Sequence, residues 1–107
     1  MLVEIIIYQT ENGKEPFYDW LDTLEENIEE RIQSRINRLK LGNLGDYKSL
    51  GNGILELRLD FGSGYRIYFG FDGFRIIVLL CGGDKKTQTK DIKKAQQYWR
   101  NYNEKNK

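Results

Sequence analysis

Two short stretches of this 107-residue sequence hold most of the polar side chains that could do chemistry. Glu56, Arg58 and Asp60 alternate with leucines, and Arg66 and Tyr68 alternate with apolar residues a few positions later. Residues at alternate positions of a strand point to the same face of a sheet. We therefore expect these side chains to share one polar face, close to the segment 84–88, which reads Asp-Lys-Lys-Thr-Gln.

This set of cations suits a phosphodiester. Arginine can bind phosphate oxygens bidentately and stabilise the charge that grows in a transition state. RNA carries its own nucleophile, the 2′-hydroxyl, so its cleavage requires neither a metal nor a protein nucleophile. Proton transfer still contributes about 10²–10⁴-fold to such reactions. The candidates for that role are Glu56, Tyr68, Lys85 and Lys86.

Other chemistries are poorly supported. The sequence has no histidine and one cysteine, which removes Ser-His and Cys-His nucleophile systems and most zinc sites. The acidic residues show no metal-ligand spacing. Gly62-Ser63-Gly64 is typical of a hairpin loop, because no strand–loop–helix with a following Lys-Ser/Thr surrounds it. We expect no metal and no cofactor.

Each candidate also has a purely structural interpretation. Asp60 and Arg66 could form a plain cross-strand ion pair, Glu56 and Arg58 could be ordinary exposed strand residues, and Lys85-Lys86 could be a solvated loop pair. Several aromatic residues are expected in the core rather than as stacking platforms for bases: Phe17, Trp20, Tyr65 and Trp99. Composition and spacing alone thus lead to a basic-faced domain that could bind nucleic acid, and leave these alternatives open.

The elements that would position these residues follow from the hydrophobic period. Residues 55–61 and 65–71 alternate at period two, the pattern of half-buried strands. A three-residue loop keeps apolar residues opposite apolar ones and polar opposite polar, and pairs Asp60 with Arg66 and Arg58 with Tyr68. Asp72-Gly73 is a type I′ turn signal, and the apolar run 74–81 predicts a third, interior strand.

The remaining elements are a strand and helices. Residues 2–9 predict a strand, residues 16–41 predict two helices or one bent helix opened by Pro16, and a short strand near Lys48 is left open. Ile92, Ala95 and later aromatic residues give the apolar stripe of a C-terminal helix, with Thr87 or Thr89 as its N-cap. The order β-α-α-β-β-β-α predicts an α+β fold. It has a mainly antiparallel sheet of about four strands, with the helices against one face.

Composition indicates a single domain over residues 1–107, with 39% hydrophobic and 31% charged residues. The apolar runs are far shorter than the roughly 20 residues of a membrane span, and the N-terminus lacks a leader pattern. The lone Cys81 lies in an apolar run and cannot form an internal disulfide, so we expect a cytoplasmic protein. Residues 1–30 hold nine acids and one lysine, whereas residues 31–107 hold sixteen Lys or Arg and seven acids. This asymmetry predicts a basic face suited to a polyanion.

Two motifs resemble those of a toxin family. Residues 50–69, which read LGNGILELRLDFGSGYRIYF, are similar to the core motif of the addiction module killer proteins, a HigB-like group of the RelE/ParE superfamily. Residues 79–88, LLCGGDKKTQ, followed by DIKKA at 91–95, resemble the second motif of that group. Tyr18-Asp19-Trp20-Leu21 and the helix end at residues 38–42 also fit, so the likeness covers nearly the whole chain.

The resemblance implies a metal-independent, ribosome-dependent mRNA endonuclease that leaves a 2′,3′-cyclic phosphate. It also implies neutralisation by a helix-turn-helix antitoxin encoded beside the toxin. Arg66 matches the arginine that related toxins place on the scissile phosphate, and Arg58 with Lys85 or Lys86 matches the further cations around it. Related toxins vary in their acid and base residues, and this chain lacks the histidine that some of them use. The ParE branch inhibits DNA gyrase on the same fold, and a non-enzymatic binding domain is a further alternative.

Overall fold

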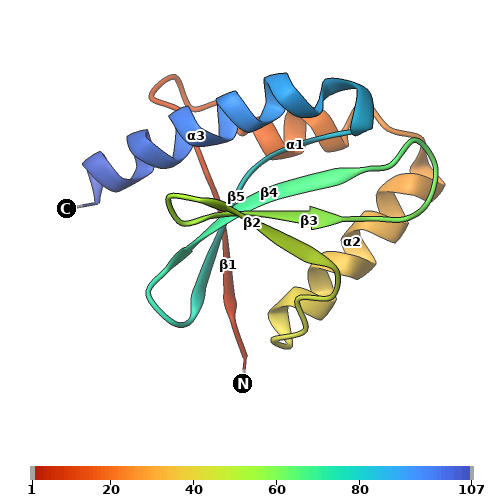
Figure 1. Cartoon of the computed structure of the whole chain (residues 1–107), viewed down its shortest axis with the longest axis horizontal. Coiled ribbons are helices and arrows are strands. Elements are labelled where there is room, and N and C mark those ends of the chain that lie inside the picture. The colour runs from red at the N-terminus through yellow and green to blue at the C-terminus, as the bar shows by residue number, and fades with distance from the viewer. Residues whose placement is uncertain (1, 107) are drawn as a thin grey trace.

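The computed structural model describes residues 2–106 and has the expected α+β architecture (Figure 1). Its elements follow in the order β1 (Glu4–Ile7), α1 (Pro16–Leu21), α2 (Glu26–Lys40), β2 (Tyr47–Gly51), β3 (Ile54–Arg58), β4 (Arg66–Asp72), β5 (Ile76–Gly83), a 3-10 turn η1 (Lys85–Thr87) and α3 (Gln88–Lys105). None of the helices within the described residues is long and apolar enough to cross a membrane.

The strands form one sheet in the order β1-β5-β4-β3-β2. Only β1 and β5 are parallel, so the expectation of a mainly antiparallel sheet is confirmed. β5 lies between β1 and β4, as its continuous apolar run predicted. The strand left open near Lys48 exists as β2, and it forms the edge of the sheet beside β3.

Helices cover both faces of the sheet, which corrects the expectation that they pack on one face. Buried residues of α1 and α2 join the inward side chains of β3, β4 and β5 in the larger core, whose members include Phe17, Ile32, Leu57 and Phe69. On the opposite face, Ala95 and Trp99 of α3 pack against a second cluster. Figure 1 shows α3 above the sheet and α2 below it. The polar face carrying Arg58 and Arg66 is thus partly roofed by α3.

The register of the β3–β4 hairpin differs from the predicted one by two residues. Arg58 lies opposite Arg66 and Glu56 opposite Tyr68, whereas the predicted partner of Arg66 was Asp60. A shift of two residues keeps every side chain on its predicted face, so the hydrophobic pattern alone could not distinguish the two pairings. The strands separate earlier because residues 59–65 form a wider connection, in which Phe61 and Tyr65 pack ring against ring with centroids 5.6 Å apart.

The helices begin and end close to their predicted positions. The segment 16–41 contains two helices, and Pro16 stands in the first turn of α1, where a missing N–H has no cost. The helical segment that ends the chain begins earlier than Thr87. Asp84 caps it by accepting hydrogen bonds from the backbone N–H groups of Lys86 and Thr87, at 3.0 and 3.2 Å. Thr87 occupies the predicted N-cap position of α3, but its side chain forms no capping hydrogen bond to that helix and instead completes the capping box of Asp84.

Candidate nucleic-acid interface

Two arginines lie directly opposite each other where β3 ends and β4 begins. Directly opposed residues of an antiparallel pair share a face, so the Arg58 and Arg66 guanidinium groups rise from the same side of the sheet. Like charges in this position destabilise a sheet by a fraction of a kcal/mol, up to about 1 kcal/mol. Both side chains are half-buried. A sequence that places two cations in such a position departs from local stability rules, which is typical of functional sites.

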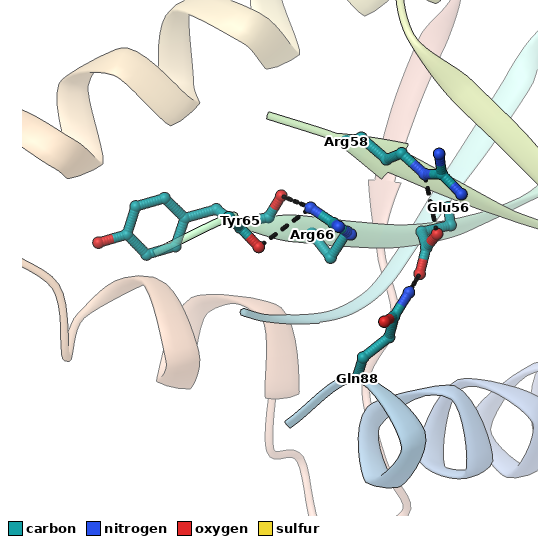
Figure 2. Close-up of polar contacts among 6 residues, drawn as sticks. Glu56, Arg58, Tyr65, Arg66 and Gln88 are labelled. Carbon is teal, nitrogen blue, oxygen red and sulfur yellow. Dashed lines mark hydrogen bonds and ion pairs between the residues drawn. The ribbon is translucent and has the colours of Figure 1, made fainter. Parts of the chain in front are cut away.

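Arg66 is held by its own loop (Figure 2). Its Nη1 atom donates to the carbonyl oxygens of Gly64 and Tyr65, at 3.1 and 3.4 Å. Its Nε atom is buried and has no hydrogen-bond partner among residues 2–106. The predicted alternative of an Asp60–Arg66 ion pair is wrong, because within the described residues the one ion pair is between Arg58 and Glu56. Among the described residues Arg66 thus has no carboxylate partner, and it has unused donor capacity.

Glu56 is completely buried and connects two elements, β3 and α3 (Figure 2). Its carboxylate accepts a hydrogen bond from Arg58 Nε at 3.3 Å and another from Gln88 Nε2 at 2.8 Å. Gln88 is the first residue of α3, so this carboxylate links β3 to the helix that follows the lysine pair. Glu56 has no contact with solvent from which to accept a substrate proton, and its contacts suit it to orient Arg58.

Tyr68 is also fully buried, beneath α3, where it packs with Ala95 and Trp99. Burial raises the pKa of its phenol well above the usual value, and the neighbouring Glu56 carboxylate raises it further. The hydroxyl nevertheless forms no hydrogen bond of acceptable geometry within the described residues. In this arrangement the phenol stays protonated at neutral pH and does not reach the surface between the arginines.

Lys85 lies next to Arg66 because η1 is tied to the hairpin loop. The backbone N–H of Lys85 donates to the Ser63 carbonyl at 3.4 Å, and the Asp84 cap fixes the turn. A Cβ atom built on Gly64 would lie 3.4 Å from Lys85 Cβ and 3.6 Å from Arg66 Nη1, so both side chains flank this glycine. Gly64 has φ +77°, a conformation that disfavours any side chain. Lys85 and Lys86 are exposed.

Sequence reasoning missed two further participants. Lys48 lies opposite Glu56 in the register of β2 and β3. Its exposed side chain therefore adds a cation to the same face of the sheet. Alternation within residues 47–51 was too short to assign that face in advance. Gln88 belonged to a recognised motif, but only the crossing of α3 over the sheet brings its amide to Glu56. Among residues 2–106 no group of side chains has the composition of a metal site.

The family profile described as phage derived protein Gp49-like (DUF891) matches residues 19–100. The chain belongs to the Gp49-like family. An uncharacterized protein of Haemophilus influenzae is 49% identical over 81 residues, which cover 75% of this chain and 82% of the relative. The Gp49-like family is a RelE-type, toxin-like family found in toxin–antitoxin systems, and membership therefore implies an antitoxin partner. The matched region includes all of the residues that build the arginine and lysine face.

Proposed function

We propose that this Gp49-like protein is the toxin of a type II toxin–antitoxin system, close to the HigB-like addiction module killer group. It cuts mRNA on the ribosome, without a metal, and so stops translation in the cytoplasm. The observation that carries the proposal is the opposed pair Arg58 and Arg66, on one sheet face, with exposed Lys85 beside them. A helix-turn-helix antitoxin that covers this face would keep the toxin inactive.

The proposed reaction uses the nucleophile of the substrate. The ribose 2′-oxygen attacks the adjacent phosphorus, the bond to the 5′-oxygen breaks, and the products are a 2′,3′-cyclic phosphate and a 5′-hydroxyl. Arg66 contacts the non-bridging oxygens and stabilises their growing charge, and Arg58 adds a second cation. Removing one such donor from a transition state typically costs about 10²–10³-fold in rate.

The remaining predicted site residues divide by exposure. Lys85 is exposed beside Arg66, and the exposed Lys86 follows it in the same turn, so we assign proton transfer to this pair. Glu56 is buried and hydrogen-bonded to Arg58, which makes it a positioning residue. Tyr68 is buried with a raised pKa, and its role is to support the face from below.

Expression from a tightly controlled promoter, followed by mapping of mRNA 5′ ends, tests the proposal. We expect growth arrest together with new 5′-hydroxyl ends inside translated messages, and neither effect with Arg66→Ala at equal protein level. Arrest with intact messages and induction of a DNA-damage response would instead indicate a gyrase-directed toxin. Absence of any arrest would indicate a binding domain. Either result would overturn the nuclease proposal.

A further inference from the structure

A second cationic site lies between α2 and the end of β3, at the strand end where Arg58 also belongs to the proposed active face. It is a cavity of about 320 Å³. Its lining includes four arginines against two aspartates: Arg31, Arg35, Arg38, Arg58, Asp46 and Asp60. Within residues 2–106 none of these six side chains forms an ion pair with another of them. The cavity therefore has an excess of positive charge, because among its arginines only Arg58 has an ion-pair partner within residues 2–106, the carboxylate of Glu56.

Three of the four arginines come from one face of α2. Arg31, Arg35 and Arg38 are spaced by four and three residues, which places them in a row along the helix. The Arg31 guanidinium lies 3.8 Å from the centre of the Phe61 ring, a cation–π contact that orients it beside the hairpin loop. Arg31 and Arg38 are exposed. They are available to a ligand from outside.

Arg35 forms the inner wall of the cavity. Its Nη2 atom donates to the Leu44 carbonyl at 2.8 Å, whereas its Nη1 atom is buried without a partner among the described residues. Burial lowers the pKa of this guanidinium, and the neighbouring Arg38 charge lowers it further. A buried donor left unsatisfied is destabilising, more so when it is charged, and an anion in the cavity would relieve part of that cost.

Arg58 connects the cavity to the proposed active face. It lines the cavity and at the same time lies opposite Arg66. Within residues 2–106 only its Nε atom is used in a hydrogen bond, to Glu56, so its two Nη groups are available. A strand whose scissile phosphate sits at Arg66 would pass Arg58 and place a neighbouring phosphate at the row on α2.

We infer that the cavity formed by Arg31, Arg35, Arg38 and Arg58 binds a backbone phosphate of single-stranded RNA that flanks the cleaved one. This inference rests on the proposed function. Arg31 and Arg38 contact the phosphate, and Arg35 shapes the inner wall of the cavity. The site therefore increases the affinity for RNA and fixes the direction in which the RNA strand runs. An acidic segment of the antitoxin is the competing occupant. The continuity through Arg58 with the proposed active face favours RNA.

Fluorescence anisotropy with a 2′-O-methyl oligonucleotide, which cannot be cleaved, tests the inference on the full chain. Arg31→Ala/Arg38→Ala is compared with a control of equal charge change, Lys93→Ala/Arg100→Ala, whose residues are exposed on α3. We expect at least a tenfold loss of affinity for the α2 variant at 0.1 M salt. Its slope of log affinity against log salt should fall by about 0.7, the value for one single-strand phosphate contact. The control should stay within twofold of the original chain.

The outcomes separate the two proposals. Equal binding by the α2 variant and the control, or no binding by the original chain, would overturn the phosphate site. Loss of antitoxin binding with unchanged RNA binding would assign the cavity to the antitoxin and overturn it too. The nuclease proposal is tested separately, by mapping mRNA 5′ ends in cells, and intact messages there would overturn it. Circular dichroism and thermal unfolding verify that each variant is folded, and Arg31→Lys/Arg38→Lys should retain most of the salt slope.

Discussion

Arg58 and Arg66 face each other at the end of a hairpin, and the chain compensates only one of them with a carboxylate. Glu56 accepts from Arg58, while Arg66 has only the carbonyl oxygens of Gly64 and Tyr65. Carbonyl groups orient a guanidinium without neutralising it. The arrangement leaves Arg66 the stronger anion-binding group of the two.

Arg66→Ala separates a functional role from a structural one. We expect loss of at least 10²-fold in cleavage rate, because a transition-state donor is removed. The free energy of unfolding should change by less than about 1 kcal/mol, since the lost hydrogen bonds are only part-buried and the repulsion between the opposed arginines is removed with them. Urea unfolding and a cleavage assay measure the two quantities. A variant that unfolds, or one that retains full cleavage, would contradict this role, and Arg66→Lys tests whether charge alone suffices.

Glu56→Gln tests whether the buried carboxylate positions Arg58. The amide keeps the shape but removes the charge that Arg58 Nε contacts, and it can still accept from Gln88. We expect the free energy of unfolding to fall by about 1–3 kcal/mol. Cleavage should fall about tenfold, with the affinity for RNA less affected than the rate. Equal losses of rate in Arg58→Ala and Arg58→Ala/Glu56→Gln would show that Glu56 acts through Arg58. Fully additive losses would contradict it.

Residue types and spacing were enough to predict the candidate site residues. They did not show which of the candidates are exposed and which are buried. Alternation correctly placed Glu56, Arg58, Arg66 and Tyr68 on one face. The periodicity of the strands does not predict where α3 packs on the sheet. That helix crosses above Glu56 and Tyr68 and turns two proposed acid–base groups into buried ones.

At the scale of elements, the hairpin β3–β4 and the turn η1 form the site, and the helices fix their positions. The strand types, the two N-terminal helices and the C-terminal helix were predictable because each has a clear hydrophobic period. The hairpin register was not, because two pairings that differ by two residues satisfy the same faces. The β2 strand was uncertain because most of its residues are exposed.

Gly70→Ala tests how closely α3 packs on β4. A Cβ atom on this glycine would lie 2.7 Å from the Trp99 ring, and the backbone conformation itself accepts alanine. We expect the free energy of unfolding to fall by about 1–3 kcal/mol because of overpacking. Ser49→Ala, on the exposed edge strand, should change it by less than about 0.5 kcal/mol. If Gly70→Ala were as stable as the original chain, the close contact of α3 with the sheet would be contradicted. A smaller side chain in Trp99→Leu should restore part of the loss.

At the scale of the whole molecule, a sheet covered on both faces leaves several titratable groups buried. Burial and, as a smaller cause, the neighbouring Asp91 charge raise the pKa of the Cys81 thiol to about 12. Burial and a hydrogen bond to Asp72 raise the pKa of Tyr102 to about 12. The sequence indicated that Cys81 belongs to the core, and its burial confirms this.

These shifts make the fold sensitive to alkali. Above pH 9 the unfolded chain releases the Cys81 proton while the folded chain retains it, so the folded state binds more protons. The free energy of unfolding therefore falls as pH rises from about 9 towards 12, and this contribution is fully present below pH 9. Urea unfolding between pH 7 and pH 11 should show this decline, with a shallower slope above pH 9 for Cys81→Ala. Identical slopes for the two chains would contradict the raised pKa.

The central claim is that cations on one sheet face allow RNA to cleave itself through its own 2′-hydroxyl. The most direct measurement uses programmed ribosomes, with an mRNA that carries a single 2′-deoxy residue at a mapped cleavage position. We predict that the unmodified message is cut there to a 2′,3′-cyclic phosphate, and that the deoxy message is intact at that position. Equal cutting of both messages would contradict it, because the nucleophile would then come from elsewhere.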